Sequence, residues 1–342
     1  RDQTRWGLTG CGTVTEVKRG PAFSKIEGTE LVAVMRRDAE NARDDAERHG
    51  VPKWYGDADR LVHDPDVNAI YIATPPGSHA EYTLQAAAAG KPVYVEKPMA
   101  RNYKECQRMI KACEKAGVPL FVAYYRRCLP AFLKVKELVE SGAVGQVRFV
   151  SIVLYRHPGQ DDLNRENLPW RVVPELAGGG YFFDLGAHQL DFLDYVLGPI
   201  SSVKGLAANQ AGWYPGEDIV CASFSFASGA LGNGAWCFTA SESAEIERTE
   251  IIGSTGKLVY SNFDLDVPVR LETDTGIQEF QLPAPAHVQQ PLIQTVVDQL
   301  QGRGECPSTG VTAARTSRVM DEIVQEWRLT SQARSGSAPA IK

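Results

Sequence analysis

The sequence lacks the features that mark several classes of protein. It has no apolar run long enough to span a bilayer, so we expect no membrane contact. It has no CxxC, no HExxH and no carboxylate cluster with metal-ligand spacing, so we expect no metal site. An excess of basic residues is also missing: 36 Lys and Arg stand against 42 Asp and Glu, a net charge of −6. This balance gives no electrostatic footprint for a nucleic acid.

Cysteine pairing is absent as well. Seven cysteines, an odd number without paired spacing, favour free thiols in a reducing compartment, and we therefore expect a cytoplasmic protein. A length of 342 residues suffices for two ordinary domains with ample core.

The first part of the chain alternates strands with helices. Predicted strands cover 31–35, 69–74, 93–95 and 119–123, and predicted helices cover 39–49, 58–63, 80–89 and 103–116. This alternation predicts an α/β domain, a doubly wound parallel sheet over residues 1–123.

After Tyr124 the pattern changes to strands with alternating polarity. They are predicted at 147–155, 203–209, 219–226, 230–238, 247–252, 257–260 and 269–272, with few helices between them. Residues 124–342 are therefore expected to form a second domain on a mainly antiparallel sheet. Helices near 291–301 and 311–330 close the chain, the last one a candidate to pack back on the first domain. A tail over 331–342, rich in Ser, Ala and Gly, is predicted to be mobile.

A glycine turn follows the first strand, in the stretch Arg5–Arg37. Gly10, Cys11 and Gly12, continued by Thr13 and Val14, approximate the G-x-G-x-x-G pattern that binds a dinucleotide pyrophosphate. Gly10 permits the tight turn, and Gly12 removes the Cβ that would keep the backbone from the phosphates. The helix that follows offers free N–H groups to them. Because Thr15 replaces the third small residue, a purely structural turn stays a rival interpretation.

The end of the second strand bears on the choice of cofactor. An acidic residue there would bond the adenosine ribose and indicate NAD, but Arg36 and Arg37 follow Met35 instead. A guanidinium fork suits a 2′-phosphate, so NADP is favoured while NAD stays open. The alternative is that both arginines are solvated surface charges.

The strand at 69–74 ends in the loop Thr74, Pro75, Pro76, which the prolines stiffen. Ligands lie beyond the carboxyl ends of strands in an open α/β sheet, which places this loop beside the cofactor. His79 opens the next helix and faces the same crevice. Its alternative role is that of a helix-start histidine bonded to backbone.

Glu96, Lys97 and Pro98 follow the strand at 93–95. A lysine at the carboxyl end of a strand in the cofactor crevice holds a positive charge beside a substrate oxygen, although a lysine in this position is usually just solvated. Pro98 is a candidate for a cis peptide bond.

One segment of the second part combines glycines with polar residues. Gly178–Gly180 allow close backbone approach, and Asp184, His188 and Asp191 are spaced to share one face of a helix. A carboxylate near a histidine raises its basicity and orients it, which predicts a proton-transfer unit. The alternative is a histidine bonded to a carboxylate for structure alone.

Taken together, these motifs resemble the glucose–fructose oxidoreductase/inositol dehydrogenase (Gfo/Idh/MocA) family. The matching pieces run in family order from residue 5 to about 325. They are Gly10–Gly12, Ala73–Pro75 with His79, Glu96–Pro98, Gly178–Gly180 with Asp184 and His188, and the turn Ile252–Gly256. The resemblance implies an N-terminal NAD(P)-binding Rossmann domain. It further implies a C-terminal α+β domain with a large open sheet for substrate binding and oligomerisation, commonly as homodimers or homotetramers.

The resemblance also implies site residues. Lys97, Asp184 and His188 become the catalytic set, and Glu96 accompanies Lys97 in the cofactor-binding motif. Further residues are implied to line the substrate site: Trp170 and Arg171, and Tyr125 and Arg126, where family members often carry Asn followed by Arg. The implied activity is NAD(P)-dependent hydride transfer at a hydroxyl or keto carbon of a sugar, polyol or related molecule.

Two other functions fit the same motifs. One is an enzyme with tightly bound cofactor that shuttles hydride between two sugars or assists eliminative glycoside cleavage. The other is a non-catalytic redox sensor that merely binds NADP, against which the intact set Lys97, Asp184 and His188 argues, since a sensor needs no proton shuttle.

Overall fold

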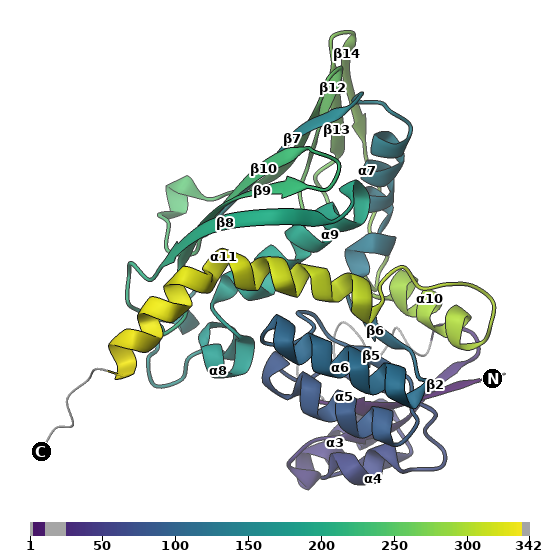
Figure 1. Ribbon diagram of the computed structural model, residues 1–342. Helices are drawn as coiled ribbons and strands as arrows, with labels where there is room; N and C mark the ends of the chain where they lie inside the picture. Colours follow the sequence, from purple (N-terminus) through teal and green to yellow (C-terminus); the bar gives the residue numbers. More distant parts are fainter. Residues whose placement is uncertain (1–2, 11–24, 337–342) are drawn as a thin grey trace, which may run out of the picture. The chain divides into compact units, whose positions relative to one another are not determined.

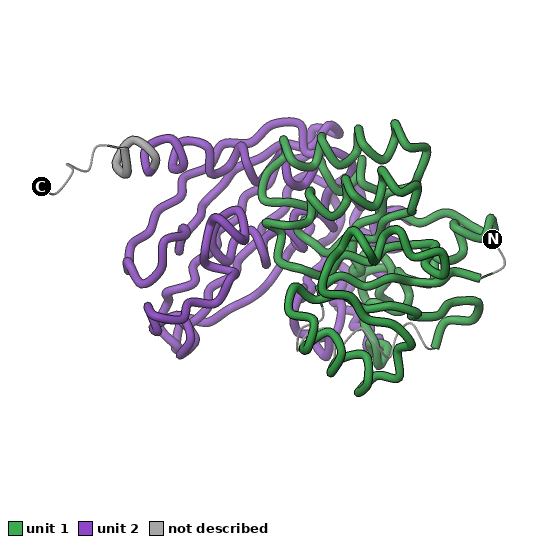
Figure 2. The backbone as a smooth tube through the Cα atoms, turned by 90° about the horizontal axis from the view of Figure 1, so that it is seen from below, with its two compact units in different colours: residues 1–133, 283–314 green, residues 134–282, 315–342 purple. Residues whose placement is uncertain are grey.

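The computed structural model describes residues 3–10 and 25–336 and divides the chain into two compact units (Figure 2). The first unit comprises residues 1–133 and 283–314, and the second comprises residues 134–282 and 315–342. The chain therefore returns to the first unit after it has built most of the second. The sequence predicts a cofactor-binding domain over residues 1–123 and a substrate-binding domain over residues 124–342. That functional division stays a prediction.

The first unit is built on a six-stranded sheet in which all the strands are parallel. The strand order is β3-β2-β1-β4-β5-β6, as in dinucleotide-binding doubly wound folds. This confirms the predicted fold class. The strands are β1 Thr4–Thr9, β2 Thr29–Met35, β3 Lys53–Tyr55, β4 Ala69–Ile72, β5 Val93–Val95 and β6 Leu120–Val122.

Helices connect these strands as predicted, within a residue or two at each end. They are α3 Ala39–His49, α4 Ala58–Val62, α5 His79–Ala88 and α6 Tyr103–Ala116, with α10 Gln290–Leu300 added from late in the chain (Figure 1). Asp38 caps α3 by accepting from two backbone N–H groups. Helix α10 buries Leu292 and Val296 in one apolar cluster with Trp6 and Tyr71 of the sheet. The core of the first unit is therefore incomplete without α10.

The second unit is built on an eight-stranded sheet of order β14-β13-β12-β11-β7-β10-β9-β8. Every pair is antiparallel except β7 with β10, which confirms a mainly antiparallel sheet. The strands are β7 Val147–Tyr155, β8 Ile200–Ala208, β9 Ile219–Phe226, β10 Leu231–Cys237, β11 Ile246–Gly253, β12 Gly256–Tyr260, β13 Val269–Thr273 and β14 Gly276–Phe280.

Helices lie on one side of this sheet. These are α7 Pro130–Glu140, α9 Ala187–Leu197 and α11 Gly310–Gly336, with the short α8 Pro174–Ala177 nearby (Figure 1). Helix α11 packs so closely on β8 that a Cβ on Gly205 would lie 2.4 Å from the Ile323 carbonyl oxygen. It also extends beyond its predicted end at Thr330, so the first residues of the predicted tail are helical; residues 337–342 lie outside the described part.

The segment around Asp184 is less regular than predicted. Phe182–Gly186 forms a π-helical turn, and the α-helix begins only at Ala187. Because a π turn holds an extra residue, the regular spacing assumed between Asp184 and His188 does not apply across it. Such turns are frequent at functional sites.

Two strands were not predicted. β3 has three residues at the edge of its sheet, and β14 is exposed along nearly its whole length. Neither presents the buried, alternating pattern from which strands are predicted.

Candidate functional site

Gly10 closes the end of β1 against the end of β4. Its φ is +83°, and a Cβ built there would lie 2.8 Å from the Thr74 backbone nitrogen. The Gly10 N–H donates to the Met35 carbonyl oxygen at 3.0 Å, which fixes the turn over β2 as well. Only glycine fits this position. The predicted cofactor contacts of Cys11, Gly12, Thr13 and Val14 lie outside the described residues.

His79 is fully buried and joins two loops at the carboxyl edge of the sheet. Its Nε2 lies 2.7 Å from the Thr74 carbonyl oxygen, and its Nδ1 lies 3.1 Å from the carbonyl oxygens of Pro98 and Met99. Burial lowers the pKa of His79, against the opposing effect of these carbonyls and of Glu96. These contacts are those of a backbone-bonded histidine, and its predicted contact with the cofactor stays a prediction.

The loop that His79 holds is itself ordered. Pro76–Ser78 forms a turn of 3₁₀ helix, and the Ser78 hydroxyl donates to the Thr74 hydroxyl at 2.7 Å. Thr74 and Pro75 are half-buried, so they stay accessible to a ligand at this edge.

Glu96 is buried at the carboxyl end of β5, and its predicted contact with the cofactor stays a prediction. It is 4 % exposed and accepts hydrogen bonds from the Tyr71 hydroxyl at 2.6 Å, the Gln289 amide at 2.8 Å and the Lys97 backbone N–H at 3.2 Å. The Tyr94 hydroxyl donates to the same Gln289 at 3.0 Å. Glu96 thus ties β4, β5 and the start of α10 together, next to Lys97 in the chain.

Lys97 is half-buried and leads into Pro98 through a cis peptide bond, as predicted. It follows β5, as Gly10 follows β1 and Thr74 follows β4. Because neighbouring parallel strands end at one edge of the sheet, these three residues share the crevice in which open α/β sheets bind ligands.

The two arginines after β2 differ in their surroundings. Arg36 pairs with the buried Asp45 of α3, with 3.0 Å between Nη1 and Oδ2. Arg37 is exposed, and its charge opposes the burial that raises the pKa of the Tyr82 phenol on α5. Of the two, Arg37 is the guanidinium available to a ligand.

Tyr125 and Arg126 lie in a 3₁₀ turn that is more buried than its polarity suggests. The Arg126 guanidinium is 6 % exposed and lies over the rings of Tyr125, at 5.1 Å, and Phe132, at 5.8 Å. The neighbouring Arg127 is 1 % exposed and donates to the Thr312 hydroxyl at 2.9 Å. This segment is therefore packed within the first unit, and the predicted contact of Tyr125 and Arg126 with a substrate stays a prediction.

In the second unit, Arg171 and Asp184 form an ion pair. Arg171 Nε lies 3.0 Å from Asp184 Oδ2, and the guanidinium stacks on the Trp170 ring at 4.5 Å. Asp184 is 9 % exposed. The stack and the pair together fix the direction of the carboxylate.

His188 lies on the first turn of α9 and is 4 % exposed. Its ring meets the Phe263 ring edge-on, with 6.1 Å between centroids. The Arg156 guanidinium lies 5.1 Å from the centroid of Phe263. The loop that carries Phe263 is held by Glu247, which accepts from the Asn262 backbone N–H at 3.0 Å and from Gln189, next to His188, at 3.3 Å.

Tyr181 adds a hydroxyl beside the Arg171–Asp184 pair. It donates to Asp162 Oδ1 at 2.6 Å, and burial, followed by this hydrogen bond, raises the pKa of the phenol. The opposing charges of Arg171 and Asp184 both act on it. The buried ring of Tyr214 meets Tyr181 at 6.2 Å.

Two family models match most of the chain. The model described as "Oxidoreductase family, NAD-binding Rossmann fold" matches residues 4–124, and the GFO/IDH/MocA C-terminal domain matches residues 132–259. Oxidoreductase P35 of Formosa agariphila is 36 % identical over 92 % of this chain and 97 % of its own length. The chain belongs to the Gfo/Idh/MocA family.

Other members with named activities are also similar. The 1,5-anhydro-D-fructose reductase of Ensifer adhaerens is 30 % identical over 90 % of this chain and 91 % of its own. The crystal structure of the aldose–aldose oxidoreductase of Caulobacter crescentus, complexed with glycerol, superposes with a TM-score of 0.84 and 26 % identity over 96 % and 98 % of the two chains. This Gfo/Idh/MocA protein is an NAD(P)-dependent oxidoreductase.

Each unit of this Gfo/Idh/MocA protein gathers one part of the predicted site. The first unit groups Gly10, Thr74 and Lys97 at one sheet edge, and the second groups Asp184, His188, Trp170 and Arg171 around the start of α9. The meeting of Lys97 with His188 over one bound cofactor stays a prediction.

Sequence reasoning missed Tyr181, Asp162, Phe263 and Arg156. Tyr181 directly follows the glycine triplet, a position that could have been noticed. Phe263 and Arg156 follow strands 100 and more residues apart in the sequence, and a single aromatic or arginine after a strand carries no signal.

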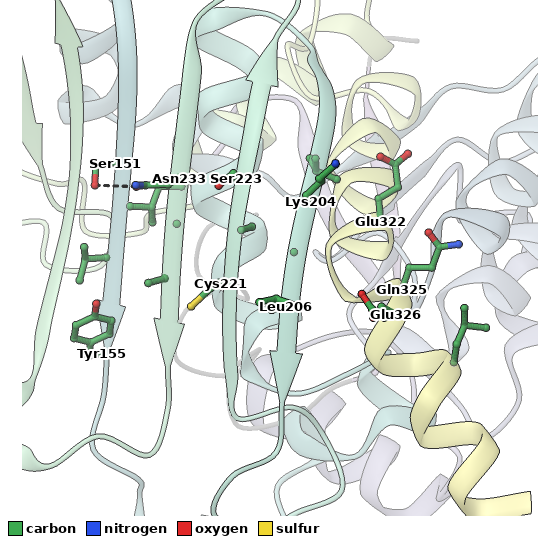
Figure 3. A pocket seen from close by; sticks show the side chains of 18 residues that line it. Ser151, Tyr155, Lys204, Leu206, Cys221, Ser223, Asn233, Glu322, Gln325 and Glu326 are labelled. Carbon is green, nitrogen blue, oxygen red and sulfur yellow. Dashed lines mark hydrogen bonds between the residues drawn. The ribbon is translucent and has the colours of Figure 1, made fainter.

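A groove on the second sheet is lined by none of these residues. It crosses β7, β10, β9 and β8 on the open face and is bounded by α11 (Figure 3). Ser151, Tyr155 and Asn233 line it, with Ser151 donating to Asn233 at 3.2 Å, and Leu206 is 72 % exposed there. None of the predicted site residues lines this groove, so we do not assign it to catalysis.

Among the described residues, no group of His, Cys, Asp and Glu could hold a metal ion, and no helix is long and apolar enough to cross a membrane. The cysteines among the described residues form no disulfide. The cytoplasmic location of the protein stays a prediction.

Proposed function

We propose that the protein is a dehydrogenase or reductase that transfers hydride between a nicotinamide cofactor and a hydroxyl or keto carbon of a sugar or polyol. The Arg171–Asp184 pair supports this best, because it orients a carboxylate on the short segment that also carries His188. The named activities of the relatives concern an anhydro sugar and aldoses, which agrees with such a substrate.

The first unit would hold the cofactor. Gly10 fits this role, since a side chain there would collide with Thr74 and close the turn. The Lys97 ammonium group would lie beside the reacting oxygen of the substrate. When bound, the nicotinamide ring supplies the hydride acceptor or donor.

The second unit would move the proton. In the oxidation direction, a ring nitrogen of His188 takes the proton of the substrate hydroxyl while the hydrogen on the same carbon leaves as hydride. Lys97 stabilises the negative charge that develops on the oxygen. Asp184, held by Arg171, accepts a hydrogen bond from a substrate hydroxyl and orients His188. Reduction of a ketone runs these steps in reverse, with His188 as the acid.

We propose NADP as the preferred cofactor, with NAD as the alternative. The exposed Arg37 at the end of β2 supports it, because a free guanidinium suits a 2′-phosphate. Arg36, engaged by Asp45, contributes less.

A second candidate keeps the cofactor bound and shuttles hydride between two sugars. The similarity to an aldose–aldose oxidoreductase favours it specifically. Extensive dialysis separates the two: a retained cofactor supports the shuttle, and an apoprotein that turns over added NADP or NAD supports the soluble-cofactor enzyme. A screen of polyols and sugars by absorbance of the reduced cofactor tests both, and no turnover of any of them by a cofactor-binding protein would contradict the proposal.

We also propose assembly as a homodimer or homotetramer through the open face of the second sheet. Leu206 and Leu231, 72 % and 55 % exposed, support an apolar contact there. Sedimentation of the wild type and of a Leu206→Asp, Leu231→Asp variant tests it, since a monomeric wild type would contradict assembly.

A further inference from the structure

The glycine turn Gly178–Gly180 packs against a distant loop of the second unit. A Cβ on Gly180 would lie 2.2 Å from the Glu217 carbonyl oxygen, and a Cβ on Gly216 would lie 2.8 Å from the Gly180 Cα. Glycine is therefore needed on both sides of this contact, which is backbone against backbone. The turn leads directly into the π-helical turn with Asp184 and then into α9 with His188.

Two side chains hold the turn from opposite ends. Glu217 Oε1 accepts the Gly180 N–H at 2.8 Å. Arg328 of α11 donates to the Gly178 carbonyl oxygen at 2.5 Å, and its guanidinium lies 4.7 Å from the centroid of Phe183, the residue before Asp184. Arg328 is in turn held by Asp321 at 2.7 Å.

Glu217 is an unusual residue for a merely structural contact. It is 0 % exposed, and its Oε2 has no hydrogen-bond partner among the described residues. Burial raises the pKa of Glu217 to about 7, against its own backbone N–H, the Gly180 N–H and the charge of Arg328. Arg328 from α11 and Asp218 beside it are the charged groups that act on it, and the Tyr214 phenol lies within range.

We propose that Glu217 and Arg328 are positioning residues for the reaction: they fix the glycine turn, and the turn fixes where Asp184 and His188 stand. The effect of this positioning on the reaction rate rests on the proposed function. Displacement of a reacting group by about 1 Å typically costs on the order of 10²-fold in rate, so a loosened turn lowers turnover without touching the cofactor.

The test compares Glu217→Gln with Glu217→Leu, two replacements of similar volume. The amide keeps an acceptor for the Gly180 N–H, and the isobutyl group does not. We expect kcat within about 3-fold of wild type for Glu217→Gln and a fall of about 10-fold or more for Glu217→Leu, with the Kd for NADPH unchanged in both. Wild-type kcat in a folded Glu217→Leu protein, or an equal loss in both variants, would overturn the proposal.

A second measurement does not depend on turnover. The imidazole signal of His188, assigned in NMR spectra by its loss in His188→Gln, is titrated in each variant. We expect its pKa to move in Glu217→Leu and to stay in Glu217→Gln. If the wild type oxidises no sugar or polyol, the proposed function fails, while this titration still decides the positioning.

Arg328→Lys serves if Glu217→Leu does not fold. It keeps the charge but loses the planar group over Phe183. We expect a smaller fall in kcat, about 3-fold, and a displaced titration of His188. An unchanged kcat together with an unchanged titration would overturn the proposal.

Discussion

Two buried glutamates, one in each unit, support a predicted catalytic residue in different ways. Glu96, the neighbour of Lys97 in the chain, receives hydrogen bonds from a tyrosine hydroxyl, a glutamine amide and a backbone N–H. Glu217, against the glycine turn that precedes Asp184 and His188, receives one from Gly180, and Oε2 is left without a partner in the described structure.

The difference lies in how well each site suits a negative charge. Several donors around Glu96 fit a carboxylate, which accepts on both oxygens. Full burial makes ionisation of Glu217 costly and raises its pKa to about 7, although two backbone N–H groups and the charge of Arg328 favour the charged form. The unit that is proposed to hold the cofactor thus contains Glu96, a carboxylate with several hydrogen-bond donors. The unit that is proposed to move the proton contains Glu217, a carboxyl group with a pKa near neutral pH.

The largest expected effect tests the division of labour between the two units. We expect His188→Asn to lower kcat by roughly 10²–10⁴-fold, because it removes the proposed acid or base and leaves a similar shape. Binding of NADPH, measured by fluorescence, should be unchanged, since His188 belongs to the second unit. Near-normal turnover would remove His188 from the mechanism.

Glu96→Leu tests the satisfied carboxylate. The Tyr71 hydroxyl and the Gln289 amide would lose a buried acceptor, and we expect the free energy of unfolding in urea to fall by about 3 kcal/mol. Glu81 on α5 is exposed, so Glu81→Leu is the control and should change the free energy of unfolding little. Equal effects in the two variants would mean that Glu96 makes no special contribution.

The pH dependence of stability tests the other glutamate. Because the folded-state pKa of Glu217 is raised, its contribution is present below about pH 4.5 and is lost as the pH rises through 7. The wild type should therefore lose about 2 kcal/mol relative to Glu217→Gln between pH 5 and pH 8. A difference in urea stability that is the same at both pH values would show that Glu217 titrates normally.

The smallest effect concerns the cofactor alone. We expect Arg37→Ala to weaken binding of NADP by about 10-fold or more and that of NAD by far less, since one charge-assisted hydrogen bond is lost. Arg36→Ala, whose guanidinium already faces Asp45, is the matched control. Equal losses for NADP and NAD in a titration of Arg37→Ala would count against the 2′-phosphate contact.

Much of the fold could be predicted because it follows from local patterns. Strands at 147–155 and 219–226 and the helix at 103–116 agree with the structure to the residue, as does the cis Pro98. The grouping of Gly10, Thr74 and Lys97 followed from the rule that parallel strands share a carboxyl edge.

The rest depends on contacts between distant segments. Nothing in the sequence near Gly180 indicates that Glu217, 37 residues later, will accept its N–H. In the same way, only the structure shows that Arg171 faces Asp184 and that Glu96 is buried. Polar residues in loops carry no periodicity from which a partner could be inferred.

The return of residues 283–314 to the first unit has a consequence for biosynthesis. The apolar cluster with Trp6 and Tyr71 is completed only by Leu292 and Val296, and Glu96 receives its hydrogen bond from Gln289. All three of these residues are synthesised long after the strands that they contact. When the Rossmann strands of a nascent chain have left the ribosome, α10 has not yet been made, and one face of that sheet is still exposed. We therefore expect fragments that stop before residue 283 to aggregate or engage chaperones, although they contain every motif of the cofactor site.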